Sequence, residues 1–170
     1  MTSPISYPLE AVEFELKDNP WRFRGETDIP LSDHKLKSLE ERFGIELPAA
    51  YRYHLMRFGA GEFGSGEVFS PDPMSEWNWW KHFEQLEPLS QIQVIPFSDS
   101  NTDCNVRMDY YVFVKKGNEI SDEVRFLNLA TPTEEIGRLE VEHFRDFIIK
   151  ECIYPIPPPL REQKEGKLGN

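Results

Sequence analysis

Residues 32–66 read SDHKLKSLEERFGIELPAAYRYHLMRFGAGEFGSG, a pattern that predicts two short helices followed by a glycine-rich exit. Ser32 suits the N-cap of the first helix because its hydroxyl can accept one of the unpaired N–H groups of the first turn. Gly44 suits the end of this helix, because glycine adopts a positive φ at little cost. The apolar residues between them recur at helical spacing and form one face. They are Leu36, Leu39 and Phe43.

The second helix follows after a short link. Pro48 suits its first position, because the N–H that proline lacks would have no helical partner there. The apolar stripe of this helix consists of Tyr51, Leu55 and Phe58. Gly59 ends the helix, and the glycine-rich residues after it predict a flexible turn that enters a strand.

The link between the two helices and the second helix carry a family signature. Gly44-Ile45, Leu47-Pro48 and Tyr51 resemble the N-terminal signature of the SUKH superfamily, although Phe58 to Gly61 stand where that superfamily has Asn-Gly-Gly. Three later segments are similar to its central strand, the strand after it and its closing helix. These segments are 94–99, 106–109 and 144–149. The resemblance covers residues 30–152.

This resemblance sets the leading expectation for function. The SUKH superfamily includes bacterial immunity proteins against polymorphic toxins and fungal regulators of cell-wall synthesis. It implies a non-enzymatic immunity protein that binds and neutralises a cognate toxin domain, such as a nuclease or a deaminase. A signalling or scaffold adaptor of the regulator type is the first alternative, and an uncharacterised hydrolase is the second.

Composition indicates a globular chain in the cytoplasm. The chain has 170 residues, of which 39% are hydrophobic and 13% aromatic, enough for one domain with a substantial core. The first residues show no secretory signal, and no apolar run is long enough to span a membrane. Cys104 and Cys152 lie far apart in the sequence, which favours reduced thiols. We therefore expect a cytoplasmic protein without membrane partners.

The remaining periodicities predict an α+β fold, with a mixed or mainly antiparallel sheet packed against helices. Residues 1–154 form the expected SUKH-like domain, and the proline-rich residues 155–170 form a flexible tail. Alternating or apolar runs predict strands over residues 11–16, 67–70, 92–97, 105–114 and 123–129. Helical spacing predicts further helices over residues 76–86 and 141–149. Ser75 is the expected N-cap of the first of these.

The negative charge is concentrated in one part of the chain. The net charge is −11, and residues 60–109 alone hold nine Asp or Glu against two Lys or Arg. Such a segment disfavours direct binding to nucleic acid, because neutralising phosphates requires clustered basic residues. It favours a basic protein partner, because complementary fields speed association. An ordinary acidic surface that only aids solubility is the alternative.

Two apparent ligand motifs lack the context that their chemistry requires. Residues 59–64 match G-x-G-x-x-G, but a dinucleotide loop follows a strand and opens a helix, whereas this one follows a helix. Residues 99–103 match the opening of a calcium loop. Cys104 stands where that loop needs glycine, and Tyr110 where it needs a bidentate glutamate. We expect a helix stop and a polar turn at these places.

No spacing of residues selects a catalytic or metal-binding group. The histidines show no zinc spacing, and neither C-x-x-C nor G-x-S-x-G occurs. The histidines are His34, His54, His82 and His143. The abundant carboxylates offer no distinguished pair. We therefore predict no catalytic residues, no cofactor and no metal.

The tryptophan cluster at residues 77–80 lies in the acidic segment. Core packing is the expectation for Trp80 and Phe83, since large aromatic residues are mostly buried. Both core packing and partner contact fit Trp77 and Trp79, because tryptophan is enriched among interface hot spots. The predicted partner-binding residues are Glu62, Glu67, Asp72, Glu76, Trp77, Trp79, Asp99 and Asp103.

Overall fold

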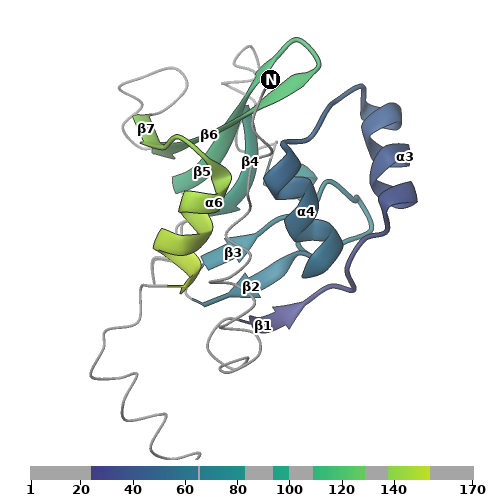
Figure 1. Cartoon of the computed structure of the whole chain (residues 1–170), viewed down its shortest axis with the longest axis horizontal. Helices are drawn as coiled ribbons and strands as arrows, with labels where there is room; N and C mark the ends of the chain where they lie inside the picture. Colours follow the sequence, from purple (N-terminus) through teal and green to yellow (C-terminus); the bar gives the residue numbers. More distant parts are fainter. Residues whose placement is uncertain (1–23, 65, 83–93, 100–108, 129–137, 154–170) are drawn as a thin grey trace, which may run out of the picture.

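A computed structural model describes residues 24–64, 66–82, 94–99, 109–128 and 138–153 (Figure 1). Its strands form two antiparallel sheets with the orders β1-β2-β3 and β4-β5-β6-β7. The strands are β1 (Arg24–Thr27), β2 (Gly61–Phe63), β3 (Gly66–Val68), β4 (Val94–Asp99), β5 (Asp109–Lys116), β6 (Glu119–Asn128) and β7 (Arg138–Val141). The helices are α3 (Asp33–Phe43), α4 (Ala49–Arg57), α6 (Phe144–Phe147) and the π-helical segment η2 (Ile148–Ile153). The predicted single α+β domain is confirmed.

Helix α3 begins and ends at the residues that the sequence predicts. The Ser32 hydroxyl accepts a hydrogen bond from the Lys35 N–H at 3.1 Å, and Gly44 adopts the left-handed conformation with φ 60°. Leu36 and Leu39 are buried on its inner face. Helix α4 starts one residue later than expected, because Pro48 holds the extended N-cap conformation with ψ 136°.

The link between α3 and α4 joins the larger sheet. The Glu46 N–H donates to the Asn118 carbonyl at 2.8 Å, and the Ile120 N–H donates to the Glu46 carbonyl at 3.1 Å. The link thus pairs with the start of β6 through a parallel bridge between Glu46 and Glu119. The family signature residues Ile45 and Leu47 are buried on either side of this bridge.

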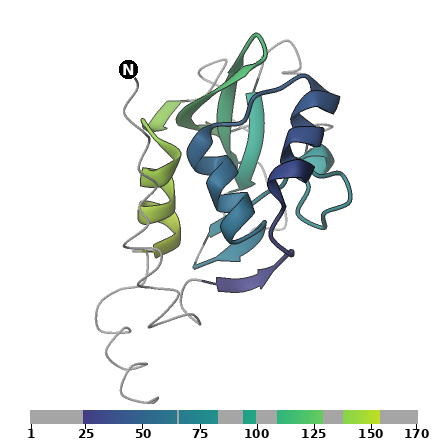
Figure 2. The same ribbon diagram turned by 45° about the vertical axis from the view of Figure 1, so that its right-hand side comes forward.

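The two sheets meet where the chain leaves β3. The Phe69 N–H donates to the Phe97 carbonyl in β4 at 2.6 Å. Helices α4 and α6 contact each other, and both contact β6. Figure 2 shows α6, α4 and α3 following one another across the molecule, as in Figure 1. One face of the sheets is therefore covered by helices, and the core lies between them.

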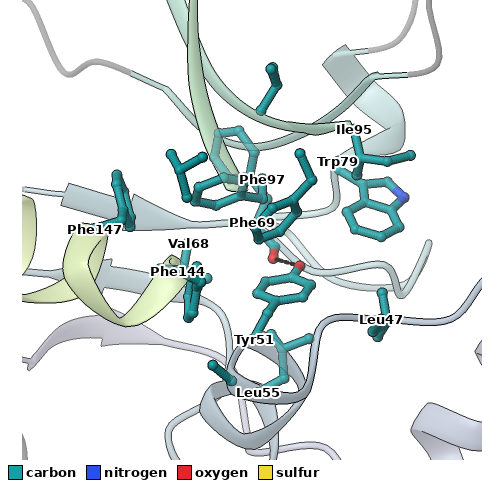
Figure 3. Packing of buried hydrophobic residues seen from close by; sticks show 14 of the residues in the cluster. Leu47, Tyr51, Leu55, Val68, Phe69, Trp79, Ile95, Phe97, Phe144 and Phe147 are labelled. Atoms are coloured by element: carbon teal, nitrogen blue, oxygen red, sulfur yellow. Dashed lines mark hydrogen bonds between the residues drawn. The ribbon is translucent and has the colours of Figure 1, made fainter. Parts of the chain in front are cut away.

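Tyr51 is the centre of that core (Figure 3). Its hydroxyl donates a hydrogen bond to the Phe69 carbonyl. Its ring lies 5.2 Å from Phe113 and 5.4 Å from Phe144, both edge to face, a favourable geometry for aromatic pairs. Complete burial raises the pKa of Tyr51 far above its usual value. The phenol therefore remains a neutral donor.

The glycine exit accommodates the C-terminal π-helical segment. Gly64 has φ 61°, and a Cβ there would lie 1.7 Å from the Cys152 carbonyl oxygen. A Cβ on Gly66 would lie 2.9 Å from the Cys152 sulfur. The two glycines therefore let η2 approach the β2–β3 hairpin closely. This is a packing role.

Four predicted elements differ from the structure or lie outside the described residues. Residues 76, 77 and 79 form turns and Asn78 forms a bridge with Ser70, so helix is described only over residues 80–82 of the predicted helix at 76–86. The backbone of this stretch pairs with Ser70, which accepts from the Trp79 N–H and donates to the Trp77 carbonyl. Val141 ends strand β7 instead of starting the last helix. The predicted strand 11–16 and the tail 155–170 lie outside the described residues.

The Tyr51 hydroxyl should contribute measurably to stability. Tyr51→Phe keeps the ring but leaves the buried Phe69 carbonyl without this donor, so the free energy of unfolding should fall by about 1–2 kcal/mol. Tyr51→Ala also removes the ring contacts and should cost about 3–5 kcal/mol. Urea unfolding followed by circular dichroism measures both. Equal unfolding midpoints for the wild type and Tyr51→Phe would show that the hydroxyl contributes nothing.

His54 should make the fold sensitive to acid. Its imidazole is fully buried among the rings of Phe58, Phe63 and Phe144, and burial lowers its pKa to about 3. In the unfolded chain histidine titrates near 6.5. The unfolded state therefore binds the proton first, and stability falls as pH drops from about 6.5 towards 3.

The variant His54→Leu should lose this sensitivity. Between pH 7 and pH 5 it should lose about 2 kcal/mol less stability than the wild type. Urea unfolding at both pH values gives the comparison. His34→Asn is the matched control, because it removes an imidazole from an exposed position of α3. The assignment to His54 is wrong if the two variants keep the same pH dependence.

Candidate partner-binding surface

Residues 70–80, here called the 70–80 loop, contain half of the predicted contact residues. Asp72 organises this loop from inside. Its N–H donates to the Ser70 hydroxyl at 3.1 Å, its carbonyl accepts from the Ser75 N–H at 3.0 Å, and its carboxylate accepts from the Met74 N–H at 3.1 Å. Lys35 of α3 forms an ion pair with the same carboxylate at 3.4 Å. Asp72 is buried and therefore has a structural role.

Three further contacts hold the 70–80 loop, one within the loop and two to other segments. The Ser75 hydroxyl donates to the Asp28 carboxylate, in the segment between β1 and α3. The Trp80 indole N–H donates to the Pro71 carbonyl at 2.8 Å, and its ring lies 4.4 Å from the ring of Phe43. The loop is therefore held at its start, its middle and its end.

The tryptophans of the loop have different surroundings. Trp79 is fully buried and stacks at 6.2 Å on Tyr51, so it is a core residue and not a surface anchor. Trp77 is half-buried, which leaves part of its ring open to a partner. Trp80 is also half-buried against the core, whereas Phe83 lies outside the described residues.

The predicted carboxylates also divide into exposed and buried side chains. Glu62 on β2 and Glu76 in the loop are exposed. Glu67 is directly opposite Glu62 across the β2–β3 pair but is buried, and Asp99 is buried at the end of β4. Direct partner contact through Glu67 or Asp99 would require these side chains to move. Asp103 lies outside the described residues.

The exposed acids continue onto a segment that the sequence did not single out. Glu26 on β1 is exposed, and its N–H donates to the Glu62 carboxylate at 3.4 Å. Asp28 is half-buried and accepts from Ser75. We call Glu26, Asp28, Glu62 and Glu76 the acidic face. Lys81 lies beside it, and its ammonium donates to the Glu76 carbonyl at 2.6 Å.

Two acidic groups with raised pKa values lie at different places in the fold. Burial raises the pKa of the Cys152 thiol and of the Asp122 carboxyl. Cys152 lies in η2, whereas Asp122 accepts from the Phe144 N–H at 3.3 Å at the start of α6. A buried thiol with a raised pKa is a poor nucleophile. These groups act in packing and helix capping.

An open surface hollow lies at the end of α3. It is lined by Lys37, Glu40, Glu41, Gly44, Ile45, Glu46 and Asn118. The carboxylate of Glu40 accepts from the Leu47 N–H at 3.0 Å and from the Arg52 guanidinium at 3.4 Å. It thus orients the link between α3 and α4. Within the described ranges, no group of three or more His, Cys, Asp or Glu side chains could hold a metal ion.

The match with a known family agrees with these observations. The model of the SMI1/KNR4 family (SUKH-1) matches residues 30–150, which is more than half of the chain. The chain belongs to the SMI1/KNR4 (SUKH-1) family. Neither curated proteins nor solved structures gave a significant match. No helix in the described part of this SUKH-1 chain is long and apolar enough to cross a bilayer.

In this SUKH-1 domain, the signature residues set the helix ends and the core packing next to the 70–80 loop. Gly44 ends α3, and Leu47 is buried beside the bridge to β6. Tyr51 bonds to the Phe69 carbonyl, one residue before the 70–80 loop begins. Sequence reasoning missed Glu26 and Asp28 because they lie before the acidic segment. Only the pairing of β1 with β2 brings them to it.

The hydroxyl of Ser75 should hold the loop in place. It donates to Asp28 and accepts from the Trp77 N–H at 3.0 Å. Ser75→Ala removes both bonds, so the amides of residues 74–77 should exchange about tenfold faster, while those of β5 and β6 keep their protection. Hydrogen exchange followed by NMR measures this. Ser75→Thr keeps the hydroxyl and is the control; unchanged exchange in Ser75→Ala would contradict the anchoring role.

Proposed function

We propose that this SUKH-1 protein is a non-enzymatic immunity protein that binds and neutralises a toxin domain in the bacterial cytoplasm. The chain belongs to the SUKH family, and this family includes toxin-immunity proteins, which supports the proposal. The observation that carries the proposal is the acidic face. This face draws its four carboxylates from β1, the segment after it, β2 and the 70–80 loop, and the half-buried Trp77 directly follows Glu76 in the chain.

The charge of this face favours toxins that act on nucleic acids. A nuclease or a deaminase must attract phosphates, so its substrate groove is basic. An acidic face can occupy such a groove and block the active site or the substrate channel. Charge complementarity also raises the association rate, which benefits a protein that must intercept a toxin quickly. The proposed contact residues are Glu26, Asp28, Glu62, Glu76 and Trp77.

A second function rests on a separate sequence feature. The proline-rich run PIPPPL at residues 155–160 favours a signalling or scaffold adaptor of the regulator type, since such runs are ligands of aromatic-lined grooves. The two functions differ in one measurable property. Only an immunity protein protects a cell that expresses the toxin domain encoded beside its gene. No arrangement in the described part of the chain supports the hydrolase alternative.

The acidic face should be needed for toxin binding. Glu62→Lys/Glu76→Lys replaces two exposed carboxylates, and we expect about 10- to 100-fold weaker binding to the neighbouring toxin domain at low salt, with loss of growth protection. Isothermal titration and co-expression measure these effects. Reversal of Glu67 or Asp72 is avoided, because both side chains are buried.

The matched control changes the same number of charges elsewhere. Glu41→Lys/Glu119→Lys alters exposed residues at the end of α3 and the start of β6, and it should keep binding within about threefold. Wild-type protein that neither binds nor protects would refute the immunity function. Equal binding by the two double variants would refute the acidic face as the contact and leave the function standing.

A further inference from the structure

Two large apolar side chains stand out on the surface. Ile29 is 87% exposed and Met74 is 86% exposed. Ile29 belongs to the segment between β1 and α3, and Met74 belongs to the 70–80 loop. Single exposed apolar residues are common on protein surfaces. Two such residues at one place form a patch, and patches mark interaction sites.

One hydrogen bond joins the two segments that carry Ile29 and Met74. The Asp28 carboxylate accepts from the Ser75 hydroxyl. Ile29 directly follows Asp28, and Met74 directly precedes Ser75. The two exposed side chains therefore flank the point where the segments join, although they lie far apart in the sequence.

Hydrogen bonds hold the backbone at or near each of the two residues. On the Ile29 side, the Asp28 N–H donates to the Ala60 carbonyl at 2.8 Å, and the Leu31 N–H donates to the Leu55 carbonyl at 3.0 Å. On the Met74 side, its own N–H donates to the Asp72 carboxylate at 3.1 Å. A partner therefore meets a preorganised patch, which reduces the entropy that binding would otherwise lose.

The charges around the patch select its occupant. Asp28 directly precedes Ile29, and Glu76 is two residues after Met74 in the 70–80 loop. Glu26 and Glu62 extend the acidic face. A second copy of the chain would bring the same carboxylates face to face, because a twofold interface pairs a patch with itself. Anionic lipid would be repelled in the same way. A basic protein surface is attracted.

We propose that Ile29 and Met74 form the apolar hot spot of the acidic face. They receive an apolar side chain of the partner that is flanked by Lys or Arg. This rests on the proposed function, because the partner is the toxin domain named there. The patch contributes affinity by excluding water, whereas the carboxylates contribute orientation and association rate.

Salt dependence separates the two contributions. Ile29→Ser/Met74→Ser should weaken binding to the neighbouring toxin domain by about 100-fold, and by nearly the same factor at 50 mM and at 500 mM salt, because apolar contacts are not screened. Glu62→Lys/Glu76→Lys should weaken binding strongly at low salt and much less at high salt. Isothermal titration of the wild type and both double variants at the two salt concentrations gives the four fold-changes in affinity.

Leu139→Ser is the matched control, because Leu139 is 47% exposed on β7 in the other sheet. It should bind like the wild type. Urea unfolding should show unchanged stability for all serine variants, since the replaced side chains are exposed. If the wild type binds and Ile29→Ser/Met74→Ser binds equally well, the hot spot is refuted while the immunity function stands.

Two other outcomes would also refute the hot spot. A wild type that fails to bind the toxin domain or protect cells refutes the proposed function, and the assigned occupant with it. A wild-type dimer in sedimentation velocity that becomes monomeric in Ile29→Ser/Met74→Ser would show that a second copy occupies the patch. We expect both proteins to sediment as the same species.

Discussion

The hydrogen bond from the Tyr51 hydroxyl to the Phe69 carbonyl is the contact on which the rest of the arrangement depends. Phe69 uses both of its backbone groups in the core, because its N–H donates to Phe97 in the neighbouring sheet. Tyr51 thereby connects α4 to the point where the two sheets meet. The chain leaves the core at Ser70, so the position of the 70–80 loop follows from this contact. The family signature thus determines where the surface loop starts without contributing to its surface.

Local patterns in the sequence were sufficient for the elements whose ends are set by neighbouring residues. The caps of α3 at Ser32 and Gly44 and the buried face of α4 are examples, because each depends on a few adjacent positions. The helix predicted after Ser75 was wrong at residues 76–79 for a physical reason. The Ser75 hydroxyl donates to Asp28, and the backbone of the stretch pairs with Ser70. Tertiary contacts therefore replaced the helical hydrogen bonds.

The sequence indicated the acidic charge of the candidate surface but not which side chains are exposed on it. The excess of acids in residues 60–109 includes Glu62 on β2 and Glu76 in the 70–80 loop, and both side chains are exposed. Burial of Trp79 and Asp99 depends on packing against distant residues such as Tyr51, which no local pattern contains. For the same reason, sequence spacing could not show that His54 lies among rings from β2 and α6. Ile29 joins the surface only through a bond between two separate segments.

The close approach of η2 to Gly64 and Gly66 has a consequence for the order of folding. The β2–β3 hairpin is synthesised well before residues 148–153, which cover it, so it leaves the ribosome without that cover. Domains fold as units once their parts are available. The hairpin and the acidic face built on it therefore reach their final form only after the last helical segment has emerged. A chain that stops short of η2 would expose the side of the β2–β3 hairpin that η2 covers to proteases and chaperones.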